Sequence, residues 1–114
     1  RTRSILKLPV SESEKPMREL EADIESRAVS RILRETGVPS SKLGQQGDPD
    51  RIFWIPGGKP LIIEFKRPGE YPRPLQVEKI RRLVALGYNV GVADNVDDAL
   101  RAVQQALDAT RLPA

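Results

Sequence analysis

The fold is decided by residues 50–66, which read DRIFWIPGGKPLIIEFK. Two runs of apolar residues flank the turn-forming sequence PGGKP. Short runs rich in isoleucine and phenylalanine, bounded by glycine and proline, are typical of β-strands. The sequence therefore predicts a hairpin of two antiparallel strands, over Arg51–Ile55 and Leu61–Lys66.

Charged residues lie inside and at the mouth of these apolar runs. A charged side chain in a core strand costs free energy unless it is paired. A register that pairs Ile55 with Lys59 places Asp50 directly opposite Glu64, because both pairs then lie on the same antiparallel ladder. Their Cβ atoms would be about 4.5–5.5 Å apart. Two carboxylates at that separation can both ligate one magnesium ion.

Lys66 follows Glu64 by two residues and shares its face of the sheet, since side chains alternate along a strand. Its ammonium could polarise an attacking water and offset the charge that develops during phosphodiester hydrolysis. The alternative is an ordinary cross-strand salt bridge between Lys66 and the two acids. The Pro-Asp pair before the first strand favours the catalytic interpretation.

The segments around the hairpin predict three helices and two further strands. Apolar residues at spacings of three and four predict helices over Met17–Glu35 and Leu75–Leu86. A last helix is expected after Asn95, whose side chain can cap it. Short strands are expected within residues 38–43 and over Tyr88–Ala93.

This order of elements, α-β-β-β-α-β-α, predicts an α/β fold with a central mixed sheet and helices on both faces. The strand after the second helix should join the sheet in parallel. A chain of 114 residues suffices for one core. We expect a single domain over residues 17–110, and we interpret residues 1–16 as an N-terminal arm or an added edge strand.

Two acids of the first helix, Glu21 and Glu25, fall within its apolar arc. A solvated pair should lie on the opposite side of the helix. A shared metal ion or Lys66 would compensate their charge. Alternatively, they lie at the edge of the arc near the helix start, where the helix dipole favours acids. Glu25 is the preferred functional candidate.

Gln76 falls in the middle of the apolar arc of the second helix. We expect that arc to be buried; it contains Leu75, Ile80, Leu83, Val84 and Leu86. An inward amide could hold a scissile phosphate or the attacking water. A glutamine that caps its helix is the alternative.

The composition excludes several classes of enzyme. With no cysteine and no histidine, the chain has no thiolate nucleophile, disulfide, histidine-ligated zinc or Ser-His-Asp triad. Hydrolytic chemistry must then use carboxylates, lysine and an oxygen-ligated metal. No apolar stretch approaches the ~20 residues that span a bilayer. No secretory signal is visible, so we expect a cytoplasmic protein without a membrane partner.

The cations are mostly arginine. The net charge is +3 with a pI near 9.5, and thirteen of the nineteen cations are arginine. Arginine forms bidentate contacts with phosphate. Composition makes nucleic acid a plausible partner, although a solvated surface would look the same.

The sequence GDPD at residues 47–50, followed by IEFK at residues 63–66, resembles the core motif of the PD-(D/E)xK nuclease superfamily. The longer pattern over residues 49–76 resembles the VRR-NUC family, particularly its small stand-alone phage-type members. The acids of EADIE at 21–25 and the last strand in GYNVGVADNV at 87–96 fit the same family. Asp48 departs from it, because that position is usually small or apolar; Asp48 could form an extra acidic site or merely cap its loop.

The resemblance implies a restriction-endonuclease-like core and a metal-dependent, structure-selective DNA endonuclease acting on branched DNA such as four-way junctions or flaps. It implies Mg²⁺ or Mn²⁺ held by Asp50, Glu64 and the backbone carbonyl of Phe65, with Glu25 or Glu21 as a further candidate ligand. The catalytic residues that it implies are Glu25, Asp50, Glu64, Lys66 and Gln76.

Basic residues near the site are candidates for contacts with DNA phosphates: Lys42, Arg51, Arg67 and Arg73. One site per chain predicts a homodimer or higher homo-oligomer for paired cuts. A phage-encoded member would act in the cytoplasm of its bacterial host. The alternative function is a nucleic-acid-binding or assembly module that keeps the nuclease fold without cutting.

Overall fold

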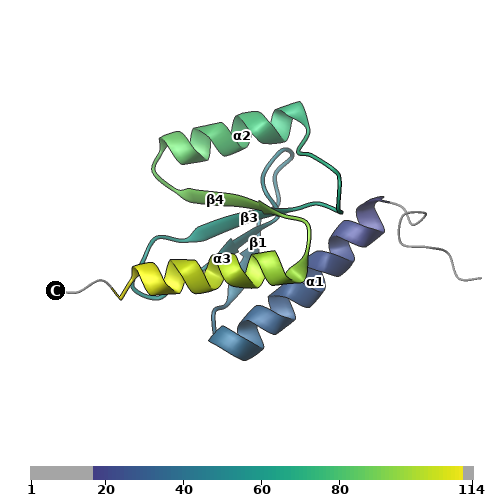
Figure 1. The fold of residues 1–114 in the computed structure, drawn as a ribbon. Coiled ribbons are helices and arrows are strands. Elements are labelled where there is room, and N and C mark those ends of the chain that lie inside the picture. Colours follow the sequence, from purple (N-terminus) through teal and green to yellow (C-terminus); the bar gives the residue numbers. More distant parts are fainter. Residues whose placement is uncertain (1–16, 112–114) are drawn as a thin grey trace, which may run out of the picture.

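The computed structural model describes residues 17–111, so the predicted arm or edge strand at residues 1–16 lies outside the described residues. Figure 1 shows a sheet with helices on either side of it. The predicted order of elements is observed. The elements are α1 (Met17–Thr36), β1 (Ser40–Lys42), β2 (Arg51–Phe53), β3 (Leu61–Phe65), α2 (Pro74–Ala85), β4 (Asn89–Ala93) and α3 (Val96–Ala109).

The sheet is mixed, with strand order β1-β2-β3-β4. Strand β2 is antiparallel to both β1 and β3, whereas β4 runs parallel to β3. This confirms the prediction that the last strand joins in parallel. Strands β2 and β3 both have a partner on each side, and all five residues of β3 are buried.

The hairpin has the predicted register but shorter strands than predicted. Arg51 pairs with Ile63 and Phe53 with Leu61. The ladder ends there, although the prediction continued it to Ile55. Pro60 has no N–H to donate to a ladder. Residues 54–60 instead form a longer connection, with a turn in which the N–H of Gly58 donates to the carbonyl of Ile55.

The main core lies between the sheet and the pair α1 and α3 (Figure 1). Helix α1 contributes Ile24, Ala28 and Ile32, which recur every fourth residue along one face. Strand β3 contributes Ile63 and Phe65 from alternate positions. Each fully buried side chain of this size contributes about 1.5–3 kcal/mol.

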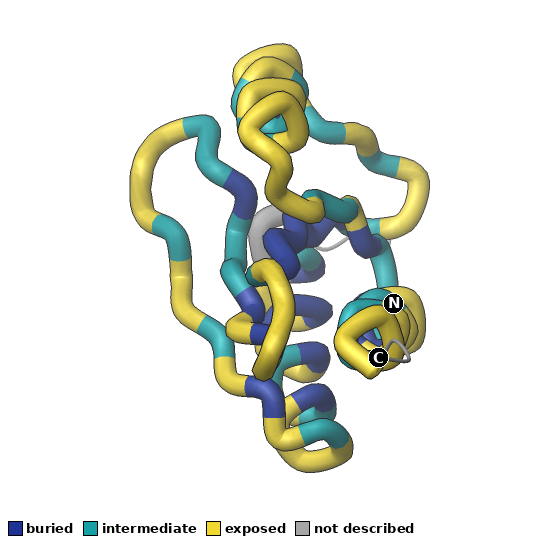
Figure 2. Tube along the Cα trace, turned by 90° about the vertical axis from the view of Figure 1, so that its left-hand side faces the viewer, coloured by how far each residue is buried: buried dark blue, intermediate teal, exposed yellow. Residues whose placement is uncertain are grey.

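Helix α2 lies on the other side of the sheet and contacts the edge strand β4 (Figure 1). The prediction of a buried apolar arc on this helix is wrong, since Leu75, Val84 and Leu86 are 51%, 53% and 73% exposed. Figure 2 shows the helix exposed along much of its length. The apolar periodicity identifies which side of α2 is apolar. That side stays largely exposed because α2 packs against β4, which is the edge strand of the sheet. Gln76 is the buried residue of α2.

Local signals set the helix ends as predicted. The side chain of Asn95 accepts a 2.7 Å hydrogen bond from the N–H of Asp98 and caps α3. Gly87, with φ +98°, turns the chain after α2. No helix within residues 17–111 has the length and apolar character needed to cross a membrane.

Candidate active site

The hairpin brings two carboxylates to one end of the sheet. Asp50 directly precedes β2. Arg51 pairs with Ile63, so continuing the register by one residue places Asp50 opposite Glu64. Asp50 Oδ2 accepts a 2.7 Å hydrogen bond from the backbone N–H of Phe65. That bond ties the loop before β2 to the end of β3. The predicted juxtaposition of Asp50 and Glu64 is therefore present.

Glu64 is 1% exposed. Its Oε2 accepts a 2.6 Å hydrogen bond from Gln76 Nε2 and lies 3.3 Å from Lys66 Nζ. Its Oε1 is the one buried side-chain oxygen or nitrogen of residues 20–111 that has no hydrogen-bond partner. A buried acceptor without a partner costs about 1–3 kcal/mol, and more when it is charged. Within the described protein, the hydrogen bonding of the Glu64 carboxylate is thus incomplete.

Both carboxyl groups are hard to ionise in this site. Burial raises the pKa of Glu64 to about 7, and the nearby charge of Asp50 adds to this effect while Lys66 opposes it. Burial also raises the pKa of Asp50, although the hydrogen bond from Phe65 works in the other direction. A divalent cation between the two groups would stabilise both ionised forms.

The donor atoms suit a hard cation, because Mg²⁺ prefers oxygen ligands and keeps several waters. Among the described residues there is no group of three or more His, Cys, Asp or Glu side chains that could hold a metal. Asp50 and Glu64 would therefore supply two side-chain ligands, and the remaining positions would fall to backbone carbonyls, water or substrate.

Lys66 is 4% exposed and lies between two acids. Its Nζ is 3.3 Å from Glu64 Oε2 and 3.3 Å from Glu21 Oε1. The alternative to a catalytic lysine was a salt bridge of Lys66 with Asp50 and Glu64. The ion pair with Glu64 is present, but the second acid is Glu21 of α1 instead of Asp50. The two interpretations are compatible, since a buried ammonium needs such partners in either case.

Glu25 and Glu21 form ion pairs with different cations. Its buried carboxylate accepts hydrogen bonds from Lys42 Nζ at 2.8 Å to both oxygens and from Arg51 Nε at 2.8 Å. Lys42 and Arg51 are direct neighbours across the β1–β2 ladder, which places both beside α1. Sequence reasoning missed this arrangement, and the signal for it was the pairing of β1 with β2.

The side chain of Gln76 caps its helix, which is one of the two predicted alternatives, and its inward amide also contacts Glu64; its contact with a phosphate or the attacking water stays a prediction. Its Oε1 accepts a 2.9 Å hydrogen bond from the backbone N–H of Arg73, which caps α2. Its Nε2 donates to Glu64. A single amide therefore connects the start of α2 to the buried carboxylate of β3.

Asp48 caps its loop rather than forming an extra acidic site. It accepts a 3.2 Å hydrogen bond from the N–H of Gln45 and forms a 3.2 Å ion pair with Lys79 of α2. The preceding Gly47 has φ +85°, and a Cβ there would lie 2.8 Å from Leu75 Cγ. The loop before Asp50 is thereby held against α2.

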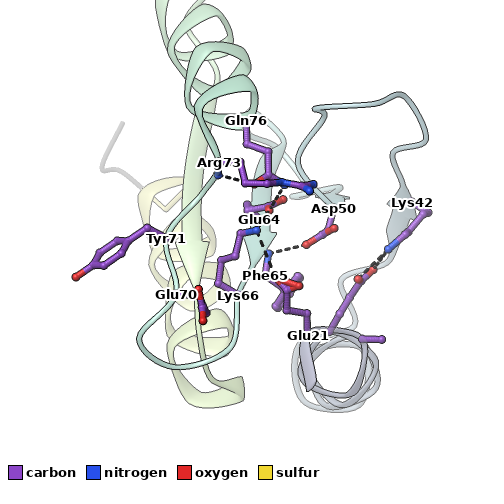
Figure 3. A pocket seen from close by; sticks show the side chains of 12 residues that line it. Glu21, Lys42, Asp50, Glu64, Phe65, Lys66, Glu70, Tyr71, Arg73 and Gln76 are labelled. Atoms are coloured by element: carbon purple, nitrogen blue, oxygen red, sulfur yellow. Dashed lines mark hydrogen bonds and ion pairs between the residues drawn. The ribbon is translucent and has the colours of Figure 1, made fainter. Parts of the chain in front are cut away.

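The side chains around Asp50 and Glu64 line a hollow of about 600 Å³ (Figure 3). All five predicted catalytic residues line it: Glu25, Asp50, Glu64, Lys66 and Gln76. Among the predicted phosphate contacts, Lys42 and Arg73 line it as well. Arg51 lies beside it with Glu25, and Arg67 pairs with Glu70 at 3.0 Å.

The lining also includes Glu70 and Tyr71, which sequence reasoning did not select. They belong to the proline-rich connection between β3 and α2. Their place directly after the Glu-Phe-Lys sequence was the available signal, because a connection that leaves the end of a functional strand passes close to the site.

Comparison with known proteins finds a related phage protein and solved structures of similar fold. No protein-family model matches the chain. The chain is 39% identical over 79 residues to "Putative nuclease p44" of Acyrthosiphon pisum secondary endosymbiont phage 1, an alignment that covers 68% of this chain and 85% of that protein.

Two solved structures share the fold. One, described as a VRR_NUC domain protein, superposes with a TM-score of 0.68 at 24% identity, covering 78% of this chain and 88% of that chain. Another, described as a VRR_NUC domain, superposes with a TM-score of 0.65 at 25% identity, covering 75% of this chain and 95% of that chain. The expected restriction-endonuclease-like core is confirmed.

Proposed function

Since the chain belongs to the VRR-NUC nucleases, as a small phage-type member, we propose that it is a metal-dependent, structure-selective DNA endonuclease. Its substrates would be branched DNA such as four-way junctions and flaps. Its place of action would be the cytoplasm of a bacterial host.

The observation that carries the metal dependence is the unpartnered Oε1 of Glu64. This oxygen belongs to a buried carboxylate that faces Asp50, and both groups have raised pKa values. We propose that Asp50, Glu64 and the backbone carbonyl of Phe65 hold Mg²⁺ or Mn²⁺. Glu21 and Glu25 are weaker candidates, because Lys66, Lys42 and Arg51 already compensate their charge.

A bound Mg²⁺ or Mn²⁺ would supply Lewis-acid polarisation of the phosphodiester and a more acidic water. The ammonium of Lys66, held between Glu64 and Glu21, would stabilise negative charge that develops on the phosphate. Gln76 would keep the Glu64 carboxylate in one orientation through its 2.6 Å hydrogen bond. Lys42 and Arg73, which line the hollow, would contact phosphates of the substrate; Arg51 lies beside the hollow, and Arg67 pairs with its lining residue Glu70.

Residues 17–111 hold one such site, so we propose that paired cuts in a junction need two copies of the chain. The exposed apolar side chains of Leu75 and Val84 on α2 and of Leu86 at its C-cap provide surface that a second copy could cover. We therefore propose a homodimer as the working form.

The test is cleavage of matched DNA substrates by the intact chain. Linear duplex, flap and four-way junction are incubated with Mg²⁺, Mn²⁺ or EDTA. We expect metal-dependent products that form faster from the branched substrates. Glu64→Ala and Lys66→Ala should abolish cutting, whereas Glu78→Gln, which alters an exposed acid of α2, should not.

Absence of metal-dependent products from every DNA substrate would overturn the enzymatic proposal, and binding without cutting would indicate the non-cleaving module instead. Equal rates on duplex and branched DNA would overturn structure selectivity alone.

A further inference from the structure

Tyr71 is the most exposed large apolar or aromatic side chain of the described residues, at 83%. It nevertheless lines the same hollow as Asp50 and Glu64. In Figure 3 its ring projects from the connecting loop and points away from the carboxylates. The ring is therefore on the rim of the hollow and faces away from Asp50 and Glu64.

The loop that carries Tyr71 is rigid at its first turn. Arg67 to Glu70 form a β-turn in which the N–H of Glu70 donates to the carbonyl of Arg67 at 3.1 Å. Pro68 at the second position and Gly69 at the third, with φ +86°, match a type II turn. The 3.0 Å ion pair between Arg67 and Glu70 joins the two ends of the turn.

The second half of the loop is restricted as well. Pro72 follows Tyr71, and a residue before proline is confined to extended conformations. Arg73, which precedes Pro74, is extended with φ −71° and ψ 161°. The loop starts after Lys66 and ends where Gln76 bonds to Glu64, so both of its ends are attached to the candidate active site.

An exposed aromatic ring on a conformationally restricted loop beside the proposed phosphodiester site matches the flat face of a DNA base, on which aromatic side chains stack. In continuous duplex the base faces are covered by neighbouring base pairs. A base face becomes available where a strand ends, splays or branches. The ring would therefore recognise interrupted DNA without reading its sequence.

We propose that Tyr71 stacks on an unpaired nucleobase next to the scissile phosphate and thereby selects branched over continuous DNA. This inference rests on the proposed endonuclease function and names the feature of the substrate that the site recognises. The aromatic ring carries the contact, whereas the phenolic hydroxyl is dispensable.

The experiment measures binding without cleavage. A Glu64→Gln background in EDTA prevents cutting, and the DNA is a flap with 2-aminopurine at the unpaired nucleotide beside the branch. A continuous duplex carrying the same base serves for comparison. The variants are Tyr71→Ala, Tyr71→Phe and, as a matched control, Tyr88→Ala, which removes a 42% exposed tyrosine that does not line the hollow.

We expect the unaltered tyrosine to quench the unpaired 2-aminopurine. Tyr71→Ala should abolish the quenching and weaken flap binding by about tenfold or more, as the loss of one base–aromatic stack predicts. Duplex binding should change by less than about twofold on the same scale. Tyr71→Phe and Tyr88→Ala should behave as the parent protein.

Three results would overturn the proposal: unchanged flap binding by Tyr71→Ala, an equal loss on flap and duplex, or a loss in Tyr71→Phe as large as in Tyr71→Ala. Thermal melting of each variant checks that the fold is intact. Because the assay needs no cleavage, it decides the role of Tyr71 even if the wild-type chain cuts no DNA, which would count against the proposed function instead.

Discussion

Gln76 Nε2 donates a 2.6 Å hydrogen bond to Glu64 Oε2, while Gln76 Oε1 accepts from the backbone N–H that precedes α2. The orientation of a buried carboxylate in β3 is thereby coupled to the first turn of a helix that is otherwise little buried. Movement of the helix start would move the carboxylate, so the capping interaction has consequences for the site as well as for the fold.

Substitution of Gln76 should separate these two consequences. Gln76→Ala removes the cap and the bond to Glu64, and we expect a loss of about 1–2 kcal/mol in the free energy of unfolding together with slower DNA cleavage. Gln76→Glu retains an acceptor for the Arg73 N–H but sets a second carboxylate against Glu64. It should keep most of the stability and still cut slowly. Thermal melts and single-turnover cleavage measure the two effects, and equal behaviour of both variants would contradict the assignment.

The stability of the metal-free chain should depend on the protonation of Glu64. Its pKa is about 7 in the folded state and near the ordinary glutamate value of 4.5 when unfolded. The folded state therefore binds more protons between these values, and stability should fall as pH rises from about 4.5 to 7. Melting temperatures in EDTA should show this decline in the wild type and a weaker one in Glu64→Gln. Glu78→Gln serves as the control and should retain the slope.

Divalent metal should raise the melting temperature at neutral pH, because it binds the ionised carboxylates of the folded chain. At a hundredfold excess over Kd, binding adds about 2.7 kcal/mol to stability. We expect a shift of several degrees in the wild type and little shift in Asp50→Asn or Glu64→Gln. An undiminished shift in both variants would place the metal elsewhere.

Release of the cations held by Glu25 should strengthen non-specific DNA binding. Glu25→Gln leaves Lys42 and Arg51, both partly exposed, without their common carboxylate, so the chain should lose about 1–3 kcal/mol of stability. The freed cations should tighten duplex binding at low salt and steepen its dependence on salt concentration. Titrations at several salt concentrations measure this change. The control is Glu35→Gln, which removes an exposed acid of the same helix; an equal effect there would attribute the result to net charge alone.

Much of the site follows from local sequence. The alternation of side chains along a strand and the turn after Ile55 were enough to predict that Asp50 lies opposite Glu64, with Lys66 on the same face. The register between neighbouring strands depends on short-range geometry, so it survives errors in strand length. The cap at Asn95 and the turn at Gly87 were predictable for the same reason.

Tertiary structure alone decided which charges meet and which apolar surfaces are covered. Glu21 and Glu25 are one helical turn apart and lie in the same apolar arc, yet one pairs with Lys66 and the other with Lys42 and Arg51. Likewise, the apolar arc of α2 identified a side of that helix but not the exposure of Leu75, Val84 and Leu86. Helical periodicity specifies the direction of a side chain about its own axis; its partner depends on where distant segments pack, and that is a property of the whole fold.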